Sequence, residues 1–303
     1  MQKITTFLWF DDQAEEAANL YVSVFSSRRG ADSGRGPSKV ADVSRYGEAG
    51  PGTPGTVMTV SFQLDGQEFT ALNGGPEYNF TPAISFFVSC ATEEEIDRLF
   101  EKLSAGGRVH MELDRYPFSD KFGWTDDRFG VSWQLNLASG AQKITPFLTF
   151  VGVQHGKAEE AINLYISLFK NSSIQAIQRY GAGGGEPEGT VMHARFSLDG
   201  QEFMAMESGL EHPWTFTPAV SLFVNCKSQA EVDNLWEKLT EGGEEGPCGW
   251  LKDRYGVSWQ IVPTVLGELL GDKDPEKSQR VMQAMFQMKK LDTAGLQRAY
   301  EQK

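Results

Sequence analysis

The chain has 303 residues, of which 40% are hydrophobic, and its formal net charge is −13. This acidic charge argues against binding to nucleic acid or to an anionic membrane surface, because both need a basic face. No stretch approaches the roughly 20 apolar residues of a membrane span, and the N-terminus lacks the basic region and cleavage site of a signal peptide. Three cysteines without a C-x-x-C pair fit a reducing compartment, so we expect a cytoplasmic protein.

The first predicted elements are a strand and a helix. Residues 3–10 are dense in Ile, Phe, Leu and Trp, which predicts a buried strand. Asp11 or Asp12 is expected to cap the helix that follows. The apolar positions of this helix recur at helical spacing and define one buried face, formed by Ala14, Ala17, Ala18, Tyr21, Val24 and Phe25.

An insertion and three strands come next. Residues 26–38 are rich in Ser, Gly and Arg, cannot bury a core and predict a flexible surface loop. The alternative is that this loop meets an acidic partner through Arg28, Arg29 and Arg35. Strands are expected near residues 39–46, 56–64 and 67–73, with Asp65-Gly66 as the hairpin turn between the last two.

The same order of elements then recurs. Ala83–Cys90 predicts a strand, and Thr92 with Glu95 forms a capping box at the start of a second helix. Gly106-Gly107 is expected to end this helix. The strands that complete the pattern are expected near residues 108–114, 122–126 and 131–137. Residues 1–139 therefore hold two β-α-β-β-β modules.

The whole pattern is repeated in residues 140–263. Residues 127–134 (Asp-Arg-Phe-Gly-Val-Ser-Trp-Gln) return as residues 253–260 (Asp-Arg-Tyr-Gly-Val-Ser-Trp-Gln). Residues 64–69 (Leu-Asp-Gly-Gln-Glu-Phe) return unchanged as residues 198–203. Because the order of such matches never changes, the chain is a tandem duplication of four modules.

A helical tail follows in residues 264–303. Asp274-Pro275-Glu276 is typical of a helix start, where proline is tolerated. The apolar stripe of this helix is expected to pack on the protein's own surface, with a groove for a partner as the alternative, and consists of Val281, Met282, Met285 and Phe286.

The chain resembles the PhnB-like family of the glyoxalase/bleomycin-resistance/dioxygenase (vicinal oxygen chelate) superfamily. Domains of this family are often labelled 3-demethylubiquinone methyltransferase. Residues 144–148, 158–161, 198–203 and 248–261 carry the resemblance. It implies an α+β fold in which tandem glyoxalase-like domains form two half-open β cups. Because single-copy relatives are commonly dimeric, it also implies an internal pseudo-dimer, with a homodimer as a further possibility.

Metal-using members of the superfamily place His or Glu at four strand positions that face the cup. The resemblance implies the positions Thr6, Asn73, Ser85 and Gln134 in the first copy, and Pro146, Glu207, Ser221 and Gln260 in the second. Only Glu207 is a good ligand, because amides and hydroxyls replace imidazole and carboxylate poorly. We therefore predict no metal site and no cofactor. The alternative is a metal-dependent lyase, isomerase or dioxygenase that uses Glu207 and a divalent metal.

The family label would require an S-adenosylmethionine site. The glycine cluster at residues 181–185 follows a strand, but the next segment is another strand rather than a helix. A nucleotide-type glycine loop needs a helix N-terminus after it, so a hairpin loop is the better interpretation and methyltransferase chemistry is disfavoured.

The expected function is binding of an unidentified small molecule, with one pocket per copy. If only one copy is functional, we expect it to be the second. Glu207 is the candidate general base, and its counterpart Asn73 is a candidate binding residue. Aromatic side chains suit an apolar ligand wall, with core packing as the alternative, at Trp9, Trp124, Trp133, Trp250 and Trp259. A non-enzymatic scaffold joined to a partner through the tail is a further alternative.

Overall fold

The computed structural model describes residues 2–26, 36–48, 50–138 and 144–302. The first copy contains two modules as predicted. The first module consists of β1 (Ile4–Phe10), α1 (Ala14–Phe25), β2 (Lys39–Arg45), β3 (Val57–Leu64) and β4 (Gln67–Asn73). The second consists of β5 (Ile84–Cys90), α2 (Glu93–Ser104), β6 (Arg108–Tyr116), β7 (Ser119–Asp126) and β8 (Ser132–Leu137). Most of the predicted 26–38 loop, including its three arginines, lies outside the described residues.

The second copy repeats this order. The third module consists of β9 (Ile144–Val151), the short η1 (Gly152–Gln154), α3 (Ala158–Leu168), β10 (Ser173–Arg179), β11 (Val191–Leu198) and β12 (Gln201–Ser208). The fourth consists of β13 (Val220–Cys226), α4 (Gln229–Thr240), β14 (Glu244–Glu245), β15 (Trp250–Lys252) and β16 (Ser258–Pro263). The tail consists of α5 (Thr264–Leu270), α6 (Pro275–Phe286) and α7 (Thr293–Glu301).

Within the described residues, four α-helices start at a residue whose side chain accepts a backbone hydrogen bond, and α1, α3 and α5 do not. Thr92 accepts a hydrogen bond from the backbone of its helix, as predicted, and Ser228 and Asp274 do the same. The start of α1 differs, because its N-cap is Gln13, which makes no side-chain cap. Asn73 Oδ1 instead accepts the Ala14 N–H at 2.7 Å, so β4 caps the helix that precedes it in the chain.

The strands form two eight-stranded mixed sheets, and each sheet takes strands from both copies. One has the order β14-β15-β16-β13-β1-β4-β3-β2 and combines the first and fourth modules. The other has the order β10-β11-β12-β9-β5-β8-β7-β6 and combines the second and third modules. Antiparallel pairing of β1 with β13 and of β5 with β9 joins the copies. We call the concave faces cup 1/4 and cup 2/3.

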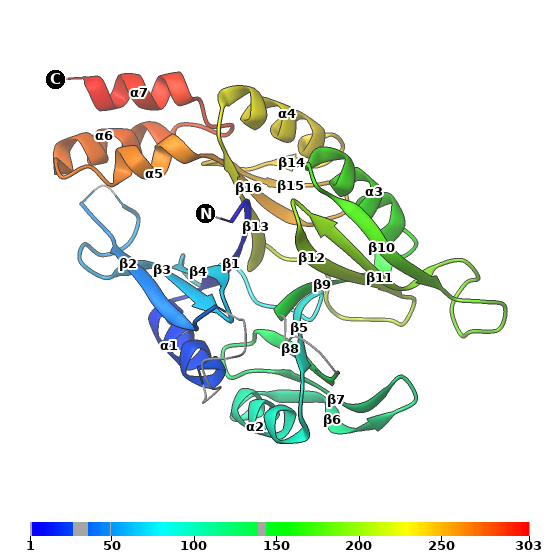
Figure 1. Ribbon diagram of the computed structural model, residues 1–303. Coiled ribbons are helices and arrows are strands. Elements are labelled where there is room, and N and C mark those ends of the chain that lie inside the picture. The colour runs from blue at the N-terminus through cyan, green and yellow to red at the C-terminus, as the bar shows by residue number, and fades with distance from the viewer. Residues whose placement is uncertain (1, 27–35, 49, 139–143, 303) are drawn as a thin grey trace.

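This pairing corrects the expectation of one cup per copy. All four modules present the same kind of first strand, so the repeat alone does not decide which first strands become neighbours. Each copy instead shares a core on the helix-covered faces of its two modules. In the first copy, the Tyr21 hydroxyl on α1 donates to Asp127 Oδ2 of the second module at 2.7 Å. Figure 1 shows α1 and α2 together at one end of the molecule, and α3 and α4 at the other.

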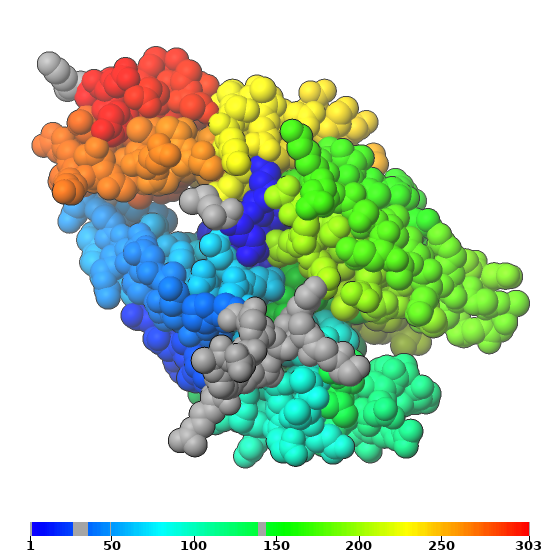
Figure 2. All heavy atoms as spheres, viewed as in Figure 1, coloured from blue at the N-terminus to red at the C-terminus, as the bar shows by residue number. Residues whose placement is uncertain are grey.

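The tail helices have a small core of their own and also cover one cup. This core contains Val262, Leu266, Leu269, Val281, Leu291 and Leu296. Figure 2 shows the tail resting against the first module and beside the fourth. No helix in the described ranges is long and apolar enough to cross a membrane.

A cavity in cup 1/4 as the candidate functional site

A cavity of about 990 Å³ lies on the concave face of the sheet built from the first and fourth modules. Its wall takes Trp9 from β1, Leu72 from β4, Trp250 from β15 and Ser258 from β16. Side chains on one face of α6 also contribute, namely Met282, Met285 and Phe286. The cavity is therefore assembled from both copies and the tail. Neither copy alone supplies the whole of its wall.

An aromatic cluster forms one side of this cavity. The ring centroid of Trp9 lies 5.0 Å from that of Tyr78 and 5.7 Å from that of Trp250, both in edge-to-face geometry. The Trp9 indole donates to the Gly75 carbonyl at 2.9 Å, which fixes its orientation. A Cβ at Gly74 would lie 2.2 Å from the Trp9 ring, so glycine is needed there for close packing.

The predicted tryptophans divide into three groups. Trp9 and Trp250 line the cavity, whereas Trp124 lies in cup 2/3, where its indole donates to Ser132 Oγ at 2.9 Å. Trp133 and Trp259 are 1% and 0% exposed, and their indoles donate to Asp127 and Asp253. The structure thus places Trp133 and Trp259 in the core rather than in a pocket wall, because they alternate with the cup-facing residues of their strands.

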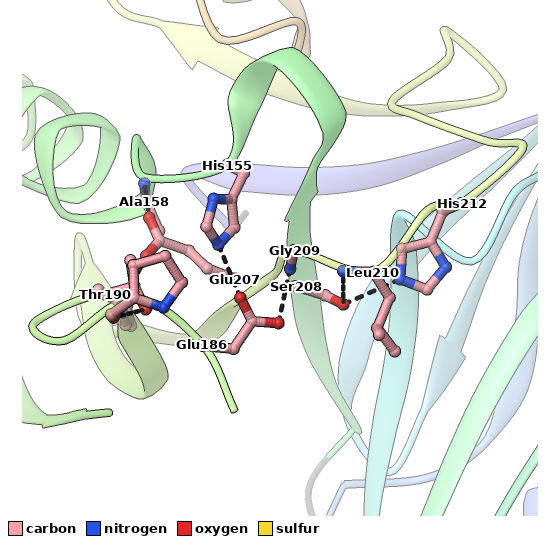
Figure 3. A network of polar contacts seen from close by, with 11 residues as sticks. His155, Ala158, Glu186, Thr190, Glu207, Ser208, Gly209, Leu210 and His212 are labelled. Carbon is pink, nitrogen blue, oxygen red and sulfur yellow. Dashed lines mark hydrogen bonds and ion pairs between the residues drawn. The ribbon is translucent and has the colours of Figure 1, made fainter. Parts of the chain in front are cut away.

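The structure also places Glu207 and Asn73 away from the cups. The Glu207 carboxylate is buried, and its oxygens accept the Ala158 N–H at 2.7 Å and the Val191 N–H at 2.6 Å. Figure 3 shows it reaching toward Ala158 at the start of α3. The side chains of Glu207 and Asn73 both point to the helix-covered face of their sheets. Neighbouring positions of a strand point to opposite faces, so an alignment that is off by one residue assigns a position to the wrong face. Glu207 therefore occupies a helix-capping position and not that of a general base.

We predict that Glu207→Ala lowers stability without changing ligand binding. The substitution leaves two buried N–H groups without acceptors, which is expected to cost about 1–3 kcal/mol. Urea unfolding measures the loss, and Asn73→Ala, which uncaps α1 in the same way, serves as the matched variant. A Glu207→Ala protein with unchanged stability and abolished ligand binding would instead restore a functional role.

The side chains at the implied metal positions do not fit a divalent metal. Of those that face the cups, Gln134 donates to Ser85 Oγ at 2.8 Å and Gln260 donates to Ser221 Oγ at 3.0 Å, so each pair is already self-satisfied. Amides and hydroxyls alone are a poor donor set for zinc or iron. Across the described ranges, no three His, Cys, Asp or Glu side chains are grouped so as to hold a metal ion.

The remaining reactive groups are engaged or deeply buried. In Figure 3, His155 contacts Glu186 at 3.1 Å and His212 contacts Ser208 at 2.9 Å. Burial lowers the pKa of His212, which favours its neutral form. Burial also raises the pKa of Cys226 to about 12 and raises the pKa of Cys248, so neither thiol is activated as a thiolate.

The two cups differ at a matched pair of serines. In cup 2/3 the Ser132 hydroxyl accepts from Trp124, but in cup 1/4 the indole of Trp250 packs edge-to-face with Trp9. Ser258 lines the cavity at 2% exposure, and its Oγ has no hydrogen-bond partner in the described part of the chain. Sequence reasoning missed this difference because the two serines sit in identical motifs.

Matched alanine variants are expected to respond in opposite directions. Ser132→Ala removes the acceptor of a buried indole N–H and should destabilise the protein by about 1 kcal/mol. Ser258→Ala removes a hydroxyl that is buried without a partner, so its effect should be neutral or stabilising by about 1 kcal/mol. Thermal unfolding compares the two, and equal destabilisation would show that the Ser258 hydroxyl is bonded in solution.

The family model described as 3-demethylubiquinone-9 3-methyltransferase matches residues 2–136 and again residues 142–262. No curated protein matches the chain. Among solved structures, a PhnB protein from Bacillus cereus is 50% identical over 45% of this chain and 100% of its own, with a TM-score of 0.40.

Glyoxalase I from Zea mays is 11% identical, with 86% of this chain and 92% of that chain covered and a TM-score of 0.52. This likeness extends across both copies, and at such low identity it shows the fold alone. Because this family model covers nearly the whole of both copies, the chain belongs to the PhnB-like family that the model describes, as a tandem duplication.

Proposed function

We propose that the protein binds a small molecule with a large apolar surface in the cavity of cup 1/4, without the divalent metal of the metal-using members of the superfamily. The cavity itself is the observation that carries this proposal. Its volume of about 990 Å³ falls at the upper end of the range typical of ligand pockets. Its wall combines tryptophan, leucine and methionine side chains, which favours an apolar ligand.

The chemistry named in the family description has less support. In the glycine run at 181–185, Gly183 and Gly185 have positive φ angles, and the run connects β10 to β11. No helix N-terminus follows it to hold the charged groups of a nucleotide-like cofactor. Binding without methyl transfer is therefore the function that the geometry favours.

The proposal is tested with the neutral fluorescent probe N-phenyl-1-naphthylamine. Leu72→Trp fills the cavity and should weaken probe binding by more than about tenfold. Met206 occupies the position in β12 that corresponds to Leu72, so Met206→Trp is the matched control and should bind as the unaltered protein does. Absence of probe binding, or equal weakening by both variants, would overturn the proposal.

Elemental analysis tests the metal-free part of the proposal separately. Purified protein is expected to contain far less than one equivalent of Zn, Ni, Mn or Fe. Near-stoichiometric metal that survives dialysis would contradict this part and would favour a metal-dependent lyase, isomerase or dioxygenase instead.

A further inference from the structure

The charged groups around the cavity are predominantly acidic. Among the described residues that line it, Glu77, Glu244 and Glu245 carry carboxylates, and Lys252 carries the ammonium. The Lys252 ammonium is already paired with Glu244 at 2.7 Å. Glu245 is paired with Lys289 at 3.4 Å, whereas Glu77 is exposed in the loop after β4 and makes no ion pair with another described residue. The cavity therefore offers an anionic ligand no free positive charge among these residues.

The aromatic side chains of the same cavity favour positive charge. The faces of Trp, Tyr and Phe rings attract cations, and tryptophan does so most strongly. Trp9, Tyr78 and Trp250 all line the cavity, and Trp9 contacts each of the other two rings edge to face. In an edge-to-face pair, the ring that presents its edge keeps its faces free of that partner, so the cluster can receive a flat cation against a tryptophan face.

The unpartnered serine supplies a further polar feature. Ser258 is almost fully buried in the cavity wall, and its hydroxyl lacks a hydrogen-bond partner among the described residues. A hydroxyl oxygen accepts a hydrogen bond from a ligand N–H, and a cationic donor strengthens such a bond. This unsatisfied buried hydroxyl points to a polar ligand group in the cavity, independently of the carboxylates.

We propose that the cavity selects a flat aromatic organic cation over neutral or anionic molecules of similar size. This inference rests on the proposed function and specifies the ligand class. The Glu77 carboxylate at the rim raises the local concentration of a cation, the tryptophans stack against its ring system, and Ser258 accepts an N–H. The apolar surface of α6 then covers the remaining face of the ligand.

Three probes of similar size separate the contributions. We expect cationic proflavine to bind at least about tenfold more tightly than anionic 1-anilinonaphthalene-8-sulfonate at low salt, and N-phenyl-1-naphthylamine to fall between them. The preference should shrink as salt rises to about 1 M, because exposed charges are screened. Fluorescence polarisation of proflavine and fluorescence enhancement of the other two provide the affinities.

Two matched variants locate the selectivity. Glu77→Gln should weaken proflavine binding about two- to fivefold and leave N-phenyl-1-naphthylamine binding unchanged. Glu211 occupies the corresponding position of the second copy and does not line the cavity, so Glu211→Gln should alter neither probe. Trp250→Ala should weaken proflavine binding about two- to thirtyfold, whereas Trp124→Ala in cup 2/3 should not.

The outcomes distinguish the two proposals. If none of the probes binds, the proposed function fails together with the ligand class. If N-phenyl-1-naphthylamine binds in the Leu72-dependent manner but proflavine does not exceed 1-anilinonaphthalene-8-sulfonate, only the cation selectivity is overturned. Equal effects of Glu77→Gln and Glu211→Gln on proflavine affinity would likewise overturn it, because the Glu77 carboxylate would then contribute no more than a carboxylate outside the cavity.

Discussion

Replacing Asp253 by alanine is expected to lower the free energy of unfolding by about 3–5 kcal/mol. Asp253 is 2% exposed, and its Oδ2 accepts from the Tyr165 hydroxyl at 2.7 Å and from the Trp259 indole at 2.8 Å. Its Oδ1 accepts the backbone N–H groups of Tyr255 and Val257. Alanine would leave four donors without an acceptor in the core, and each buried unsatisfied donor is costly.

Urea unfolding measures this loss, and the duplication supplies an internal replicate. Asp127 makes the same contacts with Tyr21 and Trp133, so Asp127→Ala should cost a similar amount. Glu15→Ala on the exposed face of α1 is the control and should change stability by less than about 0.5 kcal/mol. A loss below about 1 kcal/mol for Asp253→Ala would show that the carboxylate does not organise this core.

The same residue predicts an unusual pH dependence. Burial raises the pKa of Asp253 despite the hydrogen bonds it accepts. The folded state therefore holds this proton more tightly than the unfolded state, so the contribution of Asp253 to stability falls as the pH rises from the ordinary aspartate range through the raised pKa. Asp253→Asn does not titrate, so its stability deficit relative to the unaltered protein should shrink as the pH rises through this window. A deficit that grows with pH would contradict the direction of the shift.

The isolated first copy, residues 1–139, is expected to self-associate. In the full chain, β1 pairs with β13 from Ile4 to Leu8, and β5 pairs with β9. Removal of the second copy exposes both edges, and unpaired apolar edge strands recruit other strands. Sedimentation velocity should therefore show a dimer, in which a second fragment takes the place of the missing copy. This is the expectation of the proposal that the duplication forms an internal pseudo-dimer.

Co-expression with residues 140–303 provides the control for this experiment. The two halves should form a one-to-one complex that displaces the fragment dimer, because the native pairing also restores the tail beside the first module. A folded, monomeric first copy with a cooperative unfolding transition would contradict the proposal, since it would show that neither sheet needs its other half.

Much of the fold follows from the sequence because local signals agree with one another. The repeated blocks, the caps at Thr92 and Ser228 and the Asp65-Gly66 turn place the elements within a few residues of their observed bounds. The pairing across copies does not follow, because equivalent first strands compete for the same neighbours. Long-range pairing between similar edges is decided by the whole assembly and not by any one segment.

The site was predictable only in part, for a related reason. Trp9 and Trp250 were identified by their aromatic character, but Trp133 and Trp259 have the same character and face the core. The alternation along β8 was the missed signal, because Trp133 shares a face with Leu135, opposite the implied cup position Gln134. A signal was present in the repeat, because the spacing of Asp127 to Trp133 recurs as Asp253 to Trp259.

The order of strands in the two sheets also determines which sheet can form first during translation. The sheet of cup 2/3 is built from β5 to β12, one uninterrupted stretch of chain, whereas that of cup 1/4 joins β1–β4 to β13–β16. During translation the edge of β1 that pairs with β13 stays unpaired until the fourth module has emerged. Slowing the ribosome between β12 and β13 should therefore prolong exposure of the first module to chaperones and proteases, while the central half of the molecule is already folded.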